Sequence, residues 1–212
     1  MHIAMLGGSG RVGRKWIDYT LQNDLSVAAL VRSPEKLAEE QALAPERLTV
    51  VEGNALNADD LRRVLSGADT VACAMGTDGG TTLTDCFPLL IGEMKQLGIK
   101  RIITIGTAGI LESRSEPGLL RYQSSESRRS LTRAAEEHHK AYEQLRDSGL
   151  DWTIICPTYL PDGAATGEYR VEPNYLPEGG SRITTGDTAH FAYRLITDKD
   201  NPYVGCRVGI AY

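Results

Sequence analysis

Residues 1–13 of the chain, MHIAMLGGSGRVG, run from a short apolar segment directly into a glycine turn, with Gly7, Gly10 and Gly13 three positions apart. The apolar segment predicts a buried strand, and residues 11–21 have the apolar spacing of a helix. Phosphate groups bind to the free backbone N–H groups at the amino end of a helix, where the helix dipole also favours negative charge. The stretch therefore predicts a strand, turn and helix that bind the pyrophosphate of a dinucleotide; a plain strand-to-helix turn is the alternative. The residues expected at the pyrophosphate are Gly7, Ser9, Gly10, Arg11, Val12 and Gly13.

The rest of the chain alternates short apolar runs with helical patterns. Strands are expected at 3–6, 26–31, 48–51, 70–74, 101–105 and 152–156, and helices at 11–21, 58–65, 84–97 and 130–148, with Ser33 as the cap of a further helix. The strands are continuous Val, Ile and Ala runs, which is typical of a parallel sheet covered by helices on both faces. The sequence predicts one α/β domain over residues 1–212, a doubly wound three-layer sheet of the Rossmann type with the strand order 3-2-1-4-5-6.

Two long connections interrupt this rhythm, at 106–130 and at 157–182. Loops of this length inside a compact domain are usually binding loops or lids. Both follow strands, so they lie at the carboxyl edge of the sheet, where this fold binds its ligands. We therefore expect the two loops to form the substrate site.

The residues after the second strand select between the two nicotinamide dinucleotides. An acidic residue there accepts the ribose 2′-hydroxyl of NAD, whereas a basic residue favours the 2′-phosphate of NADP. This chain has Arg32 at that place, followed by Ser33 and Lys36, which could assist. The sequence predicts NADP(H); a solvated arginine beside an ordinary helix cap is the alternative. Further contacts are expected from the ends of the third and fourth strands, at Asn54, Ala55, Met75, Gly76 and Thr77.

Composition excludes several other classes of function. The net charge is −5 and the basic residues are dispersed, so nucleic acid is not an expected partner. No stretch approaches the roughly 20 apolar residues of a membrane span, and residues 1–6 have no basic or long apolar segment, so no secretion signal is expected. The cysteines have no metal-ligand spacing and are expected to be reduced thiols of a cytoplasmic protein without a metal: Cys73, Cys86, Cys156 and Cys206.

Motifs spread over nearly the whole chain carry a resemblance to a known family. They are the segments 7–13, 30–32, 53–54, 75–77, 98–103, 145–157, 166–169 and 186–187. In these segments the chain resembles the atypical short-chain dehydrogenase/reductases of the NAD(P)H-binding, NmrA-like group, and within that group the biliverdin-IXβ reductase or flavin reductase family. The resemblance implies an NADPH-dependent reductase of flavins or linear tetrapyrroles, with Pro157, Thr158 and Tyr159 beside the nicotinamide. Asn54, Thr107 and Tyr159 depart from that family's residues, and the segment 111–129 bears little likeness to it.

Ordinary short-chain reductases protonate a carbonyl with a Tyr-x-x-x-Lys pair, which this chain lacks. Lys140 is the matching lysine, but Glu136 stands in the tyrosine position, and the two residues also have the spacing of a surface ion pair. His138 falls on the expected apolar stripe of its helix. Its two possible roles are a hydrogen-bonded core residue and an acid of the reaction. That stripe comprises Leu131, Ala134, Ala135, His138, Tyr142 and Leu145.

Thr107 and Tyr159 follow the fifth and sixth strands, so they are expected at the cleft. Thr107 could bind a substrate carbonyl or orient the nicotinamide, with a turn cap as the alternative. Tyr159 could lie against the nicotinamide, with a core tyrosine as the alternative.

The missing Tyr-Lys pair points to the class of acceptor. Hydride transfer to a flavin depends mostly on proximity and alignment, whereas ketone reduction without an acid is harder. We therefore expect a planar conjugated small-molecule acceptor such as a flavin, quinone or tetrapyrrole, with FMN or FAD as a substrate, and a monomer or homodimer. A non-catalytic NADP(H)-binding redox sensor and a sugar epimerase or dehydratase are the alternatives.

Overall fold

The computed structural model describes residues 1–77, 79–127, 131–198 and 200–212 of the chain. Its centre is an eight-stranded sheet in the order β3-β2-β1-β4-β5-β6-β8-β7. The first six positions confirm the predicted order, and two late strands extend the sheet. The strands are β1 (His2–Leu6), β2 (Ser26–Val31), β3 (Leu48–Glu52), β4 (Thr70–Cys73), β5 (Arg101–Ile105), β6 (Asp151–Pro157), β7 (Arg170–Pro173) and β8 (Cys206–Ala211).

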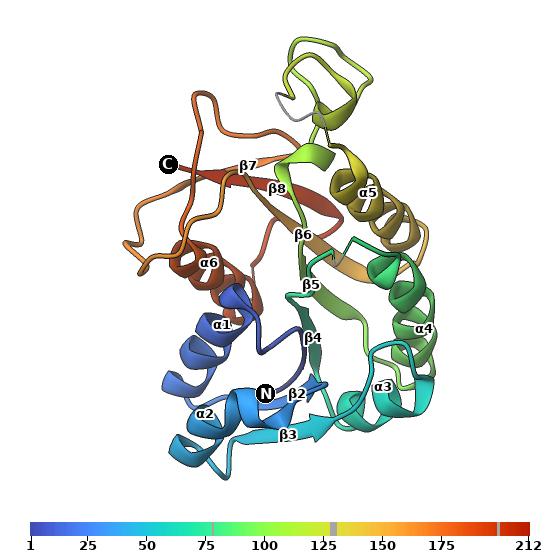
Figure 1. The fold of residues 1–212 in the computed structure, drawn as a ribbon, viewed down its shortest axis with the longest axis vertical. Coiled ribbons are helices and arrows are strands. Elements are labelled where there is room, and N and C mark those ends of the chain that lie inside the picture. The colour runs from blue at the N-terminus through green and yellow to red at the C-terminus, as the bar shows by residue number, and fades with distance from the viewer. Residues whose placement is uncertain (78, 128–130, 199) are drawn as a thin grey trace.

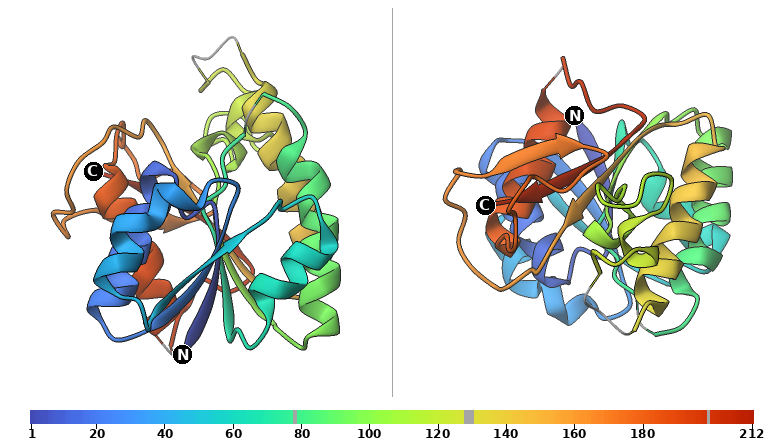
Figure 2. Two further views of the ribbon diagram at one scale, coloured as in Figure 1. Left: turned by 60° about the horizontal axis from the view of Figure 1, so that its bottom comes forward. Right: turned by 90° about the horizontal axis from the view of Figure 1, so that it is seen from above.

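Helices cover both faces of the sheet (Figures 1 and 2). One face carries α1 (Arg11–Gln22), α2 (Ala38–Leu43) and α6 (Thr185–Thr197), and the other carries α3 (Ala58–Leu65), α4 (Thr82–Gln96) and α5 (Arg133–Arg146). Three short 3-10 turns complete the chain: η1 (Pro34–Leu37), η2 (Ala108–Ile110) and η3 (Arg121–Gln123). No helix within 1–77, 79–127, 131–198 or 200–212 has the length and apolar character to cross a membrane.

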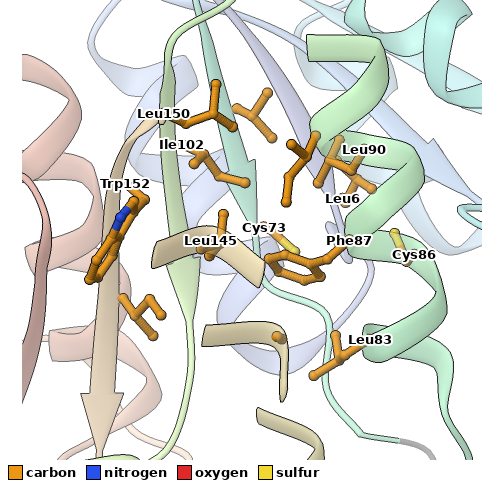
Figure 3. Packing of buried hydrophobic residues seen from close by; sticks show 14 of the residues in the cluster. Leu6, Cys73, Leu83, Cys86, Phe87, Leu90, Ile102, Leu145, Leu150 and Trp152 are labelled. Carbon is orange, nitrogen blue, oxygen red and sulfur yellow. The ribbon is translucent and has the colours of Figure 1, made fainter. Parts of the chain in front are cut away.

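Each face of the sheet has its own apolar core, as the continuous apolar strands predict. On the side of α4 and α5, Phe87 and Leu145 pack against the strand residues Ile102 and Trp152 (Figure 3). On the side of α1 and α6, Trp16 is fully buried. Burial of one such side chain contributes about 1.5–3 kcal/mol, so these two layers hold the strand ends in place.

The two late strands occupy the edge that the sequence left undefined. Strand β8 pairs in parallel with β6, and β7 pairs antiparallel with β8. Strand β7 is short and contains Glu172 and Pro173, which suit an edge because a proline cannot donate to a further strand.

Two details of the helices differ from the prediction. Ser33 precedes the 3-10 turn η1, and its side chain does not cap a helix, because the α-helix begins only at Ala38. Helix α5 begins at Arg133, while the predicted start at 130 lies outside the described residues.

The buried face of α5 is rotated from the predicted stripe. Of the predicted stripe, Leu145 is buried and Tyr142 packs against the core, whereas Ala134 is exposed. The structure also buries Glu137 and Ala141, and Leu131, which is 85% exposed, precedes the helix. The cause is a hydrogen bond that the apolar pattern does not show: a Glu137 carboxylate oxygen accepts from the backbone N–H of Leu83, 2.7 Å away. The carboxylate therefore satisfies a first-turn amide of α4 and turns toward the core.

Candidate functional site

The glycine turn between β1 and α1 is held so closely that larger residues do not fit. Gly7 has a positive φ of 74°, and a Cβ atom there would lie 2.6 Å from the backbone carbon of Ala74. A Cβ atom on Gly13 would lie 2.2 Å from the carbonyl oxygen of Gly7. These contacts bring β1, α1 and the end of β4 together around one backbone turn.

The amino end of α1 offers its backbone to an anion. Its N-cap is Gly10, which has no side chain to occupy the first-turn N–H groups, and no acidic residue lies in that turn. Helix amides without partners and the helix dipole favour a bound phosphate group. The turn therefore fits the pyrophosphate of a dinucleotide, whose nicotinamide supplies hydride chemistry when bound.

A groove of about 380 Å³ opens over this turn along the carboxyl ends of the first four strands. It brings together eight of the predicted cofactor residues: Gly7, Ser9, Gly10, Arg32, Asn54, Ala55, Met75 and Gly76. The other ten do not line it: Arg11, Val12, Gly13, Ser33, Lys36, Thr77, Thr107, Pro157, Thr158 and Tyr159. Pro157 is buried at the end of β6 and lines neither this groove nor the cleft described below.

Arg11 instead joins the turn to the loop 157–182. Its guanidinium donates to the carbonyl oxygen of Leu160 at 3.1 Å and to the carboxylate of Asp162 at 3.2 Å. Lys36 uses its carbonyl oxygen to accept a hydrogen bond from Arg14. The Arg11 guanidinium therefore has a structural contact beside the groove, whereas Lys36 contributes only its backbone there.

A second cleft, of about 550 Å³, lies on the same edge of the sheet, at the carboxyl ends of β5 and β6. Its floor contains the predicted residues Thr107, Thr158 and Tyr159. Its walls come from the loop before α5, the start of α5 and the end of the loop 157–182: Arg121, Tyr122, Glu126, Ser127, Leu131, Thr132, Ala134, Ala135, Gly180 and Ser181.

The chain belongs to the NAD(P)H-binding family, which it matches over residues 7–199. Three solved structures are similar to it over nearly their whole length. A candidate epimerase from Bacteroides thetaiotaomicron has 26% identity and a TM-score of 0.82, and the match covers 100% of this chain and 96% of that one. The anaerobilin reductase of Escherichia coli O157:H7 has 24% identity and a TM-score of 0.78, with 99% and 97% covered. A candidate NADH-flavin reductase from Streptococcus pneumoniae has 20% identity and a TM-score of 0.78, with 100% and 99% covered.

Membership of this NAD(P)H-binding family agrees with the position of the glycine turn, while the predicted catalytic residues divide into two pairs. Thr107 and Tyr159 share the second cleft. Lys140 is exposed on α5 and lines neither cleft. His138 borders a small apolar space beside Phe87, where burial lowers its pKa to about 4 and keeps the ring neutral.

Thr107 and Tyr159 differ in how firmly the fold holds them. The Thr107 hydroxyl accepts a long hydrogen bond, 3.4 Å, from the backbone N–H of Gly109 and caps η2, so it combines the cap role with a place in the cleft. Tyr159 is 62% exposed, so it is not the core tyrosine considered as the alternative. Its carbonyl oxygen accepts from Ile183, which fixes its backbone only.

Glu126 organises the wall of the cleft between η2 and α5. Its carboxylate accepts from the Ser113 hydroxyl and from the Ser115 backbone N–H, both at 2.8 Å, and pairs with Arg121. Burial alone would raise the pKa of Glu126, but these hydrogen bonds and the Arg121 charge lower it to about 2. The wall therefore depends on one ionised carboxylate.

Asp187 anchors the loop 157–182 from the other side. This fully buried carboxylate accepts from the backbone N–H groups of Thr166 and Gly167, both at 2.8 Å, and from the Tyr212 hydroxyl at 2.6 Å. The loop, α6 and the last residue of the chain are thus joined at one point.

Sequence reasoning missed residues in both sites. In the groove these are Leu6, Leu30, Val31, Leu56 and Thr82, which line it together with Gly53 and Ala74 beside the predicted set. Gly53 belongs to the segment 53–54 of the resemblance and directly follows β3, as expected. In the cleft, Tyr122 and Glu126 carry no local signal, since their position depends on contacts of a long loop. Among the described residues, no three His, Cys, Asp or Glu side chains converge as a metal site.

Proposed function

We propose that the protein is an NADPH-dependent reductase that transfers hydride to a planar conjugated acceptor. The observation that carries the proposal is the succession of two hollows along one sheet edge. The 380 Å³ groove begins at the glycine turn, and the 550 Å³ cleft continues beyond β5 and β6. A dinucleotide that lies along the edge with its pyrophosphate at the turn directs its nicotinamide toward the cleft.

Arg32 supports NADPH over NADH. Its side chain lines the groove, and it is exposed at the end of β2. Within the described ranges it forms no ion pair with a carboxylate, so the guanidinium is free for a phosphate. A planar guanidinium donates two parallel hydrogen bonds to a phosphate, and such charge-assisted bonds are the stronger class.

The form of the cleft supports a flat acceptor. Tyr122, Tyr159 and Leu131 present aromatic and aliphatic surfaces around it, with hydroxyl groups of Thr107, Thr158 and Ser181 between them. The names of two of the three similar structures, an anaerobilin reductase and a candidate NADH-flavin reductase, agree with a tetrapyrrole or flavin acceptor, while that of the third, a candidate epimerase, agrees with an alternative.

The alternatives fit the molecule less well. A non-catalytic NADP(H) sensor requires the groove but has no use for a second cleft of this size. A sugar epimerase of the extended class needs a lobe for the sugar nucleotide, whereas residues 170–211 form β7, α6 and β8 and complete the sheet.

Steady-state oxidation of NADPH and NADH tests the proposal, with FMN, a benzoquinone and biliverdin as acceptors. The proposal predicts turnover above the non-enzymatic rate with at least one acceptor, and faster turnover with NADPH than with NADH. Tight NADP⁺ binding without turnover of any acceptor would contradict it and favour the sensor.

A further inference from the structure

A tyrosine outside the expected catalytic set lies in the cleft with a histidine behind it. Tyr122 belongs to η3 and lines the cleft that also contains Thr107. Its hydroxyl oxygen is 3.0 Å from Nδ1 of His139, and it accepts from the side-chain amide of Gln123 at 3.3 Å. When Nδ1 of His139 also donates, the phenol proton is not used in either of these two hydrogen bonds and is available to a molecule bound in the cleft.

His139 connects this hydroxyl to the surface of the molecule. Its ring lies edge-on to Tyr122, with the centroids 5.8 Å apart, and stacks beside Tyr142 at 6.3 Å. Its Nε2 atom is 3.9 Å from a carboxylate oxygen of Glu143, and the side chains of His139 and Glu143 are 25% and 48% exposed. One face of α5 thus provides a path from the cleft to water.

We propose that Tyr122 is the proton donor of the reaction and that His139 returns a proton to it from solvent. This inference rests on the proposed reductase function. The acceptor gains a hydride, with its electron pair, from the nicotinamide and gains a proton from the Tyr122 hydroxyl, whose O–H bond breaks. His139 then passes its Nδ1 proton to the phenolate and takes up a solvent proton at Nε2, which leaves a neutral ring protonated at Nε2. Each turnover thus consumes one hydride from the nicotinamide and one proton from solvent, so atoms and charge balance.

Other polar groups in the cleft are less suited to this role. Glu126 is ionised because its hydrogen bonds and Arg121 hold its pKa near 2. Thr107 is an aliphatic alcohol, a far weaker acid than a phenol, and Tyr159 has no hydrogen-bond partner for its hydroxyl among the described residues.

The groups around Tyr122 keep it protonated before the reaction. Burial raises the pKa of its hydroxyl, and the nearby carboxylates of Glu136 and Glu143 act in the same direction, against a smaller lowering by Gln123. The hydroxyl is therefore a phenol at neutral pH, and the donors Gln123 and His139 stabilise the phenolate that proton transfer leaves. This arrangement replaces the absent Tyr-x-x-x-Lys pair with a tyrosine and a histidine that are 17 residues apart in the chain.

The inference predicts a difference between acceptors. A quinone must gain a proton on oxygen to leave as a neutral product, whereas a reduced flavin is stable as an anion. Loss of the Tyr122 hydroxyl should therefore slow quinone reduction much more than flavin reduction.

Single-turnover reduction of a benzoquinone and of FMN by NADPH tests this on Tyr122→Phe, with Tyr193→Phe on the distant helix α6 as the matched control. We expect the quinone rate of Tyr122→Phe to fall about 100-fold, since a positioned acid contributes 10²–10⁴-fold. NADP⁺ affinity, the melting temperature and the FMN rate should stay close to those of Tyr193→Phe. For His139→Ala we expect a loss of quinone rate that added imidazole restores.

The outcomes separate this inference from the proposed function. A Tyr122→Phe variant that reduces quinone at the wild-type rate would overturn the role of Tyr122 and leave the reductase intact. Equal losses with quinone and FMN, together with weakened NADP⁺ binding or no rescue by imidazole, would show that Tyr122 and His139 only shape the cleft. If the wild-type protein reduces none of FMN, the benzoquinone and biliverdin, the reductase function itself fails. If it reduces biliverdin alone, the same variants are compared with biliverdin, and an unchanged rate of Tyr122→Phe overturns the role of Tyr122.

Discussion

The groove and the cleft lie on the same sheet edge but are built differently. The groove is made by a glycine turn and by residues that directly follow β1, β2, β3 and β4, so its shape comes from the backbone of the fold. The cleft is closed by side chains of two long loops and the start of α5, which are distant in the chain. A groove built from the backbone can keep its shape while the side chains of long loops change. We therefore infer that the fold determines dinucleotide binding and that the two loops determine the choice of acceptor.

The largest effect is expected at the glycine turn. In Gly13→Ala the new methyl group would overlap the Gly7 carbonyl oxygen, at 2.2 Å, so α1 must move away from β1. We expect the free energy of unfolding to fall by about 3 kcal/mol, the upper end of the usual cost of overpacking. NADP⁺ affinity should fall as well, because the first-turn amides move with the helix. Urea unfolding and calorimetric titration measure the two effects; unchanged stability and affinity would show that the turn is not packed as described.

The next effect concerns the selectivity of the groove. Loss of one charge-assisted hydrogen-bonding group costs about 1.5–3 kcal/mol, so Arg32→Ala should reduce the preference for NADP⁺ over NAD⁺ by roughly 10- to 100-fold. Arg47→Ala is the control, since Arg47 pairs with Asp24 and bonds to the Leu21 carbonyl oxygen, away from the groove. Dissociation constants for both dinucleotides check the result. If Arg32→Ala keeps the wild-type preference for NADP⁺, Arg32 does not select the 2′-phosphate.

A pH-dependent effect is expected in the cleft. The folded-state pKa of Glu126, about 2, lies below the usual value for glutamate, so its contribution to stability is present above about pH 4.5 and is lost as the pH falls toward 2. In Glu126→Gln this part of the acid dependence should disappear, and the KM for the acceptor should rise because the wall loosens. Urea unfolding from pH 5 to 2 measures the difference, with the exposed residue changed in Glu46→Gln as the control. Parallel curves for wild type and Glu126→Gln would contradict the assignment.

The smallest effect on stability is expected at a glycine that has space for a side chain, unlike Gly7 and Gly13. Gly92 lies inside α4, and a Cβ atom there would meet no atom within 4 Å. Gly92→Ala should raise the free energy of unfolding by about 1 kcal/mol, because alanine is the better helix former. Its NADP⁺ affinity should equal that of the wild type. Destabilisation by Gly92→Ala would show that glycine packing around α4 is misjudged.

Sequence reasoning succeeded for the groove, which is built from strand ends, and failed for parts that depend on contacts between distant segments. The six central strands and the groove residues that follow them were predictable, since each strand has its own apolar run and each contact lies beside a strand end. The edge strand β7 was not, because four residues that include Glu172 and Pro173 have no apolar signature. The buried face of α5 was predicted only in part, because Glu137 turns inward to bond to Leu83, a partner 54 positions away. Tyr122 and His139 were missed for the same reason: only the folded loop brings them together.

Calorimetric titration of the wild-type protein with NADP⁺ and with NAD⁺ tests the central claim most directly, since the groove and Arg32 act in binding before any reaction. The account predicts one site per chain that binds NADP⁺ at least about tenfold more tightly than NAD⁺, as expected from about 1.4 kcal/mol or more of extra interaction with the 2′-phosphate. No heat with either dinucleotide would contradict the groove, and equal affinity for both would contradict the selection by Arg32.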